Sequence, residues 1–408
     1  MTPRADVLVV GAGPAGAAAA VAARARGLDV LVVDKAGFPR DKTCGDGLTA
    51  SALRLLERIG IDVPALPGYA AVRETVLVSP SGREVALPLP EVGEHSAVVP
   101  RVELDDALVR RVRELGIDVR EQVALTELHH DTDGVQARFA DGTSIGVKFV
   151  IAADGHWSSV RRLTGTRSPG LGQADLGTWH AFRQYFCEVE DPRQWVLFER
   201  DLLPGYAWVF PLSGGRANVG FGVLRGAQSR SGKELAALWR NLLDRPRMRA
   251  VLGPQAQPEG SQRAWPIPAT YDRARLTDGR RLYVGDAAGV VDPMTGEGIA
   301  QALATGIFAA DAIARGITRG HDVAVIAERY TKVVDRALGR DLRFATTLQR
   351  VLRSSIGTRA AIRTAGLSAW TRRNFARWMF EDYPRAVVLT PDRWRRGMFT
   401  PPGAYRAA

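Results

Sequence analysis

A run of aliphatic residues near the start of the chain leads directly into a cluster of glycines. The run is residues 7–10, and the glycines follow in the string GAGPAG at residues 11–16. A continuous aliphatic run is typical of a parallel strand buried on both faces. Glycines at this spacing allow a tight turn, close approach to a pyrophosphate and close packing of helix on strand. A second such strand, residues 30–33, ends at Asp34, where a carboxylate can accept hydrogen bonds from ribose hydroxyls. This order of strand, helix, strand and acid predicts a dinucleotide-binding fold.

Length and composition limit the class of protein. With 408 residues the chain can bury a large core, and two domains are expected. The chain has no run of 18 uncharged apolar residues, and its N-terminus lacks the features of a signal peptide, so neither a membrane span nor a leader is predicted. Two cysteines, Cys44 and Cys187, are too few for a disulfide framework, which favours a reducing, cytoplasmic location.

The positive charge of the chain lies in its last quarter. The formal net charge is +11, and residues 315–408 contain 19 Lys and Arg against 7 Asp and Glu. A solvated helical face is the simplest interpretation, while an anionic membrane surface or an acidic partner protein would also suit this charge. Arg372, Arg373 and Arg377 are the residues through which we expect such docking. No nucleic-acid-binding motif accompanies the charge, so no nucleic-acid partner is predicted.

Two further strings accompany the glycine fingerprint. One is ADGHWSSVR at residues 153–161, and the other is GDAA at residues 285–288, followed by Pro293 and by TGEG at residues 295–298. The three strings in this order resemble the flavoprotein group that includes para-hydroxybenzoate hydroxylase, flavin-dependent halogenases and the geranylgeranyl reductases. The resemblance implies that the cofactor is FAD.

The resemblance also implies a task for each string. A helix that begins near Glu297 would aim its N-terminal dipole at the N1/C2 carbonyl edge of the flavin, where negative charge develops on reduction. Asp286 would bind ribityl or ribose hydroxyls, Arg101 would reach the phosphate or ribityl region, and Asp154 would lie near the pyrophosphate. The residues implied in FAD binding are Gly11, Gly13, Pro14, Ala15, Gly16, Asp34, Lys35, Arg40, Cys44, Gly45, Arg101, Asp154, Gly285, Asp286, Pro293, Gly296, Gly298 and Ile299.

Two segments distinguish between members of this group. FPRDKTCGDGL at residues 38–48 resembles the loop after the second strand in geranylgeranyl reductase-like proteins. PGYAWVFP at residues 204–211 resembles their Tyr-x-Trp-x-Phe-Pro motif. Halogenases carry Trp-x-Trp-x-Ile-Pro at the comparable position, where this chain has Tyr206 and Phe210, and this difference counts against halogenation.

Three residues of these segments are the catalytic candidates. Tyr206 and Trp208 are two apart on a predicted strand, so they face the same side. They would form either an aromatic wall for an apolar substrate beside the flavin or ordinary sheet core. Cys44 is either a small apolar residue or an active-site thiol or steric gate near the ring. No metal-ligand spacing occurs, so no metal is predicted.

The resemblance favours an FAD-dependent reductase. Reduced FAD would deliver a hydride from N5 to a carbon–carbon double bond of an apolar, isoprenoid- or polyketide-like molecule, and a proton donor would complete the reduction. A monooxygenase of the same group, acting through a C4a-hydroperoxyflavin, and a flavin-holding protein without chemistry are the alternatives. The same fold serves the reductase and the monooxygenase reactions equally, so fold alone does not decide between these two.

No second glycine fingerprint follows the first, so a separate NAD(P)H domain is not expected. The electron source is either NAD(P)H that docks transiently in a surface groove or a partner reductase or ferredoxin. The partners expected are therefore an apolar small molecule, an electron donor and, through the basic region, a membrane surface.

The alternation of segments predicts an α/β (α+β) fold with discontinuous domains. A Rossmann-like FAD-binding domain would carry an inserted, sheet-rich substrate domain of mixed or antiparallel strands, and a basic helical region would follow. The expected boundaries are residues 1–70, 98–165 and 275–320 for the FAD-binding domain, 71–97 and 166–274 for the substrate domain, and 321–408 for the C-terminal region.

Overall fold

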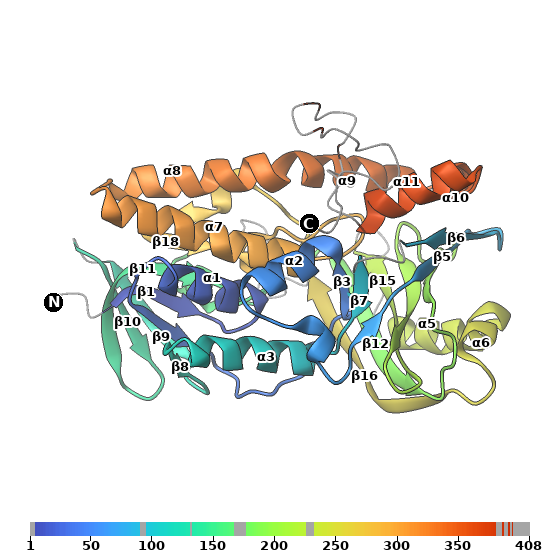
Figure 1. The fold of residues 1–408 in the computed structure, drawn as a ribbon, viewed down its shortest axis with the longest axis horizontal. Helices are drawn as coiled ribbons and strands as arrows, with labels where there is room; N and C mark the ends of the chain where they lie inside the picture. The colour runs from blue at the N-terminus through green and yellow to red at the C-terminus, as the bar shows by residue number, and fades with distance from the viewer. Residues whose placement is uncertain are drawn as a thin grey trace.

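The computed structural model describes residues 5–89, 95–130, 133–166, 177–225 and 232–380, together with positions 386, 391 and 394. Residues 167–176 of the predicted substrate domain and residues 395–408 of the predicted C-terminal region lie outside the described residues. The described part of the chain forms two large sheets that lie end to end, with helices along their faces (Figure 1).

The first sheet is built on the aliphatic runs. β1 (Ala5–Val10) pairs in parallel with β2 (Val30–Val33) on one side and with β11 (Ser144–Ala152) on the other. These strands are largely buried, as expected for parallel strands covered on both faces. Across the described part of this sheet the order is β17 (Thr277–Asp278), β18 (Arg281–Tyr283), β11, β1, β2 and β8 (Asp118–Arg120). β10 (Val135–Phe139) pairs with β11, and β9 (Leu125–His130) pairs with β10.

Helices cover this sheet, and small residues bring two of them together. α1 (Pro14–Arg24) packs against α7 (Ile299–Thr318). A Cβ on Gly306 of α7 would lie 2.2 Å from the carbonyl oxygen of Ala15, so the close contact requires glycine at this position. The other helical segments around this sheet are α2 (Ala50–Arg58), η1 (Val63–Ala65), α3 (Arg101–Glu114), α4 (Ser159–Leu163), η2 (Arg273–Arg275) and η3 (Gly285–Ala288).

The second sheet comes from the segments predicted for the substrate domain. Its neighbouring strands are antiparallel except for one parallel pair, β13 with β5. α5 (Gly232–Asp244) and α6 (Pro246–Leu252) belong to the apolar cluster on one face, where Trp239 stacks on Phe221. The strand order is β16 (Gln257–Ile267), β12 (Trp179–Cys187), β15 (Arg216–Leu224), β14 (Tyr206–Leu212), β13 (Gln194–Leu197), β5 (Glu74–Val78) and β6 (Glu84–Pro88).

A small sheet joins the two large ones. Its order is β3 (Gly47–Thr49), β7 (Ser96–Val98) and β4 (Ala70–Ala71), and the sequence patterns did not predict these short strands. β3 follows the Cys44 loop directly, so the small sheet anchors that loop between the two large sheets. Both cysteines, Cys44 and Cys187, are free thiols.

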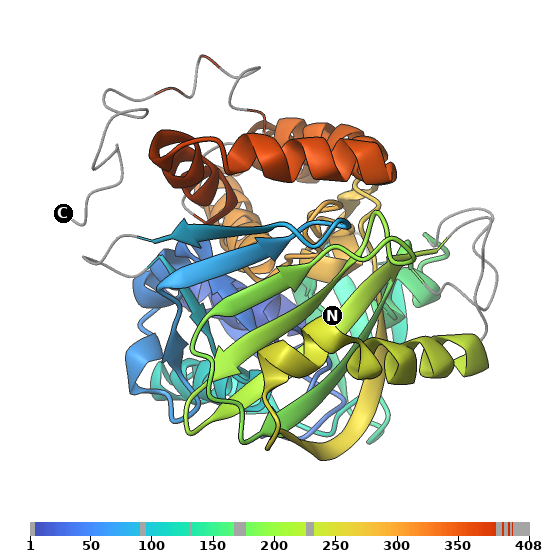
Figure 2. The ribbon, with the colours of Figure 1, turned by 90° about the vertical axis from the view of Figure 1, so that its right-hand side faces the viewer.

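The predicted C-terminal helices are present and cover both sheets. α8 (Val323–Val334) runs through a π-helical segment, η4 (Asp335–Gly339), into α9 (Arg340–Leu352). α10 (Ser355–Ala365) and α11 (Ala369–Phe380) then lie over the second sheet, in orange to red in Figure 2. The expectation that Arg377 faces a partner is wrong, because this side chain is only 1% exposed and forms part of the packing beneath α11.

Candidate active site

The glycine fingerprint forms the turn between β1 and α1 at the edge of a cavity of about 540 Å³, here called the nucleotide cavity. Gly11 has a φ of +100°, and a Cβ there would lie 2.4 Å from the carbonyl oxygen of Ala153. A Cβ on Gly13 would meet only the Arg40 guanidinium among the described residues, at 3.5 Å, so this backbone faces open space. α1 begins at Pro14 without a side-chain cap, which leaves its first amides available to an anion.

Acidic side chains line two further parts of the nucleotide cavity. Asp34 follows β2, and its carboxylate accepts hydrogen bonds from the amides of Ala12 and Ala36, each at 2.8 Å. Asp154 accepts one from the amide of Val160, while its Oδ1 atom is buried without a hydrogen-bond partner among the described residues. Buried carboxylate oxygens are normally satisfied, so this atom favours a ligand that carries hydrogen-bond donors.

Basic side chains approach from the Cys44 loop and from α3. Arg101 forms a bidentate ion pair with Asp105, with both N–O distances at 2.8 Å, and Arg40 approaches the same carboxylate at 3.2 Å. Burial opposes the charge of Arg101, but Asp105 outweighs it and raises the pKa of the guanidinium above its ordinary value. Arg101 is therefore a permanent cation beside the cavity.

A second ion pair lies where the two halves of the site meet. Lys42 lies 3.0 Å from the carboxylate of Asp286. Burial alone would raise the pKa of Asp286, but Lys42 overcomes this effect and holds the pKa below its ordinary value. Asp286 is therefore ionised at neutral pH, and its oxygens remain acceptors for hydroxyl groups.

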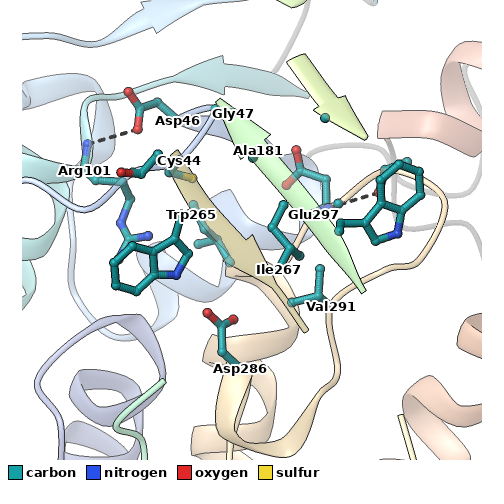
Figure 3. A pocket seen from close by; sticks show the side chains of 18 of the residues that line it. Cys44, Asp46, Gly47, Arg101, Ala181, Trp265, Ile267, Asp286, Val291 and Glu297 are labelled. Carbon is teal, nitrogen blue, oxygen red and sulfur yellow. Dashed lines mark hydrogen bonds between the residues drawn. The ribbon is translucent and has the colours of Figure 1, made fainter. Parts of the chain in front are cut away.

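A second cavity adjoins the first and is here called the aromatic cavity. Both cavities are lined by Pro14, Lys42, Arg101, Trp265 and Asp286, so they form one continuous site. Figure 3 shows Arg101 and Cys44 on one side of the aromatic cavity, with Asp286 and Val291 on another.

β14 supplies one wall of the aromatic cavity. Tyr206, Trp208 and Phe210 alternate along the strand, and the ring centroids are 6.1 Å apart for the first pair and 6.0 Å for the second. The Tyr206 hydroxyl donates a hydrogen bond to the carbonyl oxygen of Thr295, which lies in the loop before α7. The wall is therefore tied to the helix that closes the other side of the cavity.

The N-terminus of α7 faces this cavity. Gly296, Gly298 and Ile299 line it, and Gly298 caps α7 without a side-chain hydrogen bond. The positive end of the dipole of this 20-residue helix thus points to the place where the resemblance puts the N1/C2 carbonyl edge of the flavin.

A fully buried carboxylate lies beside the Cys44 loop. Asp46 has a positive φ of +64°, which is uncommon for a residue other than glycine, and its side chain is 0% exposed. Its Oδ2 atom accepts hydrogen bonds from the Tyr185 hydroxyl and the Asn218 amide, both at 2.7 Å. Burial raises the pKa of Asp46 to about 6, although the nearby charge of Arg183 and these hydrogen bonds act in the opposite direction.

Asn218 connects this carboxylate to the aromatic wall. Its Oδ1 atom accepts a hydrogen bond from the indole of Trp208 at 2.9 Å. Its Nδ2 group donates to the carbonyl oxygen of Cys44 at 2.8 Å as well as to Asp46. The thiol of Cys44 lines the aromatic cavity, and burial raises its pKa, so the group is a neutral thiol and not a thiolate.

The structure brings nearly all the predicted cofactor residues to one or both cavities. Two residues do not line either cavity. Gly16 packs inside the fingerprint turn, where a Cβ would lie 1.8 Å from the carbonyl oxygen of Gly11. Pro293 accepts a hydrogen bond from Gln349 at 2.9 Å through its carbonyl, which ties the loop to α9. These two residues serve packing in this structure.

Several residues of the site were not predicted as site residues. Trp265 lines both cavities from β16, and Asp46, Tyr185 and Asn218 form the buried network. The sequence signal for Asp46 was its place between two glycines directly after Cys44. Tyr185 and Asn218 carry no such local signal.

Comparison with known proteins then identifies the family. The model of a family described as an FAD binding domain matches residues 4–332. The chain belongs to this FAD-binding family. It is 34% identical to a menaquinone reductase from Mycolicibacterium smegmatis, over 86% of this chain and 87% of the relative. It is 31% identical to digeranylgeranylglycerophospholipid reductase 2 from Methanopyrus kandleri, over 85% of this chain and 86% of the relative.

A solved structure shows the same fold. A geranylgeranyl bacteriochlorophyll reductase-like protein from Thermoplasma acidophilum superposes with a TM-score of 0.79 at 25% identity, covering 95% of this chain and 98% of that one. The predicted resemblance to geranylgeranyl reductase-like flavoproteins is therefore confirmed, and the protein is an FAD-dependent oxidoreductase.

The side chains present fit FAD. The open backbone at Gly13, the uncapped N-terminus of α1 and the unsatisfied oxygen of Asp154 suit a pyrophosphate with attached sugar hydroxyls. The N-terminus of α7 suits a ring edge that becomes negative on reduction.

Within the described residues, every helix is too short or too polar to cross a bilayer.

Proposed function

We propose that the protein reduces a carbon–carbon double bond in an apolar isoprenoid chain. The observation that carries this proposal is the aromatic cavity, which adjoins the nucleotide cavity and has mostly apolar walls. Its apolar lining includes Trp179, Ala181, Tyr206, Trp208, Phe210, Ile267, Val291 and Met294. When bound, reduced FAD supplies the hydride for such a reduction. The two reductase relatives are named for a menaquinone and for a digeranylgeranyl lipid, which supports a substrate of this kind.

The aromatic wall would orient the chain. Trp208 is held by its indole hydrogen bond to Asn218, and Tyr206 is held by its bond to Thr295. Rings fixed in this way present a rigid apolar surface and lose little freedom when a substrate binds. In this proposal Cys44 is a steric gate, because its protonated thiol is not a nucleophile.

Reduction of a double bond requires one proton besides the hydride, and Asp46 is our candidate to hold it. This residue lines the aromatic cavity, and its raised pKa keeps a proton available close to neutral pH. Tyr185 of β12 is half-buried and donates to Asp46 Oδ2, so its hydroxyl is in direct contact with the carboxylate. In this proposal the proton reaches Asp46 through the Tyr185 hydroxyl.

An anaerobic experiment tests the proposal without an assumption about the electron donor. The FAD-loaded protein is photoreduced in the absence of oxygen and mixed with a lipid that carries an unsaturated isoprenoid chain and no quinone ring. The matched control substrate is the same lipid with a saturated chain. We expect reoxidation of the flavin with the unsaturated chain alone, and a product that has gained two hydrogens in that chain.

The alternatives predict different results. A monooxygenase would leave the polyisoprenoid unchanged without oxygen and would insert labelled oxygen into a substrate under air. A binding protein would retain the isoprenoid without flavin reoxidation. Either result would exclude the reductase proposal.

A further inference from the structure

The large apolar side chains that the described residues leave exposed all lie at position 325 or beyond. The most exposed of them are Ile356 of α10 at 71%, Leu367 just after α10 at 66% and Trp370 of α11 at 60%. These three large apolar groups are exposed within one short segment, and clustered apolar surface marks interaction sites.

The same region has an unusual distribution of charge. Residues 342–380 contain eight arginines and neither aspartate nor glutamate. Arg359 and Arg363 are exposed on α10, as is Arg353 just before it. Since acidic residues are absent from this segment, its outer surface is strongly cationic.

Helical spacing puts the apolar and basic groups on one face. Ile356 and Arg363 are seven residues apart, which places them on one side of α10, and Arg359 lies beside them. Leu367 lies in the bend directly after the end of this helix. We call these four residues the outer face of α10. The buried positions of this helix, Thr358, Ile362 and Ala365, lie on the opposite side.

That opposite side packs on the layer that forms the aromatic wall. Ile362 belongs to the same apolar cluster as Trp208 and Phe210, together with Ala376 and Phe380 of α11. Figure 2 shows α10 and α11 above the second sheet. The second sheet lines the aromatic cavity, and α10 belongs to a single layer of helices that covers this sheet. The outer face of α10 therefore lies on the side of that layer that points away from the sheet.

We propose that the outer face of α10, with Trp370 at the start of α11, docks on an anionic lipid bilayer. Apolar side chains flanked by arginines on an interfacial helix insert at the level of the headgroups, and tryptophan favours the same depth. Arginines attract anionic lipids over the last nanometre of approach. The benefit of docking rests on the proposed function, because an isoprenoid chain resides in the bilayer and would enter the cavity from there.

Vesicle sedimentation tests this inference. The FAD-loaded protein is mixed with phosphatidylcholine vesicles that either contain or lack phosphatidylglycerol. We expect binding that requires phosphatidylglycerol, and at least a tenfold loss of affinity in two double variants, Ile356→Ser with Leu367→Ser and Arg359→Glu with Arg363→Glu. The matched controls are Val325→Ser on α8, 49% exposed, and Arg249→Glu on α6, 68% exposed, which should bind like the wild type.

Each outcome supports or overturns the inference. Equal binding by the wild type and both double variants would overturn it, as would no binding by the wild type. Loss of binding with the charge reversal but not with the serine variants would also overturn it. Attraction to headgroups alone, or a role of the arginines in binding an acidic protein, would then account for the positive charge without insertion of apolar side chains. A bilayer-dependent shift of tryptophan emission that is absent in Trp370→Phe would support insertion directly.

The test is separable from the proposed function. All substituted positions are exposed, so flavin content and thermal unfolding should match the wild type. Reduction of a detergent-solubilised isoprenoid substrate should persist in the double variants. If vesicles bind but no isoprenoid is reduced, the proposed function fails and the docking surface stands.

Discussion

Replacement of Asp46 by asparagine should change how protein stability depends on pH. Burial raises the pKa of Asp46 from 3.8 to about 6, although the charge of Arg183 acts in the opposite direction. One pKa unit is worth about 1.4 kcal/mol, so this difference corresponds to about 3 kcal/mol. The folded protein keeps the proton up to about pH 6, whereas the unfolded chain releases it near pH 3.8. The stabilisation is therefore complete below the lower value and is lost as the pH rises to the upper one.

Urea denaturation of the FAD-free protein from about pH 3 to pH 8 measures this effect. An asparagine oxygen can still accept hydrogen bonds from Tyr185 and Asn218, while its amide group would face the backbone amide of Arg101. The cost of that contact does not depend on pH. The informative quantity is therefore how the difference in free energy of unfolding between wild type and Asp46→Asn changes with pH. We expect the wild type to lose about 3 kcal/mol relative to the variant between the two ends of the titration.

A control with the opposite sign is available. Hydrogen bonds from Thr143 lower the pKa of the exposed Asp141, so wild type should lose stability relative to Asp141→Asn as the pH falls. If the curves of wild type and Asp46→Asn run parallel over the whole range, Asp46 titrates like an ordinary carboxyl group. The reasoning about the buried network, and the proton-holding role that depends on it, would then be refuted.

Three other substitutions give distinct expectations. Gly13→Ala should leave the thermal unfolding of the ligand-free protein unchanged but weaken FAD binding by about tenfold or more in a flavin fluorescence titration, because its Cβ enters the nucleotide cavity. Gly16→Ala should lower the melting temperature of the ligand-free protein, because its Cβ would lie 1.8 Å from the carbonyl oxygen of Gly11. Trp208→Phe should cost about 1–3 kcal/mol in urea unfolding, because the buried Oδ1 atom of Asn218 loses its donor, and wild-type stability would show that this bond contributes nothing.

The cofactor half of the site could be predicted from sequence because its signals are local. Gly11 and Gly13 are read together with the strand before them and the helix after them. Asp34 closes the next strand, where strand ends necessarily gather at one edge of a parallel sheet. The alternation of Tyr206 and Trp208 likewise placed both rings on one wall. In these cases the spacing along the chain determines the spacing in the fold.

The buried network could not be predicted in this way. Tyr185 lies on β12 and Asn218 lies on β15. Both reach Asp46 only because these two strands pair with each other beside the loop that contains Asp46. Their separation from Asp46 in sequence is 139 and 172 residues. The burial of Arg377 was missed for a similar reason, since it depends on which side of α11 packs on the sheet. Composition reported the charge of that region but not the orientation of each arginine.

The aromatic wall and the buried carboxylate cannot be changed independently, because Asn218 bonds to both. Its Oδ1 atom must accept from Trp208 while its Nδ2 group donates to Asp46 and to the carbonyl of Cys44. An aspartate at this position would lose both donated bonds and place a second carboxylate against Asp46, which would raise the pKa of the pair. A leucine would leave a buried indole N–H and a carbonyl oxygen without partners. An amide satisfies all three neighbours at once. A substitution of Asn218 that changes the pKa of Asp46 would therefore also displace Trp208 in the wall that would hold the substrate.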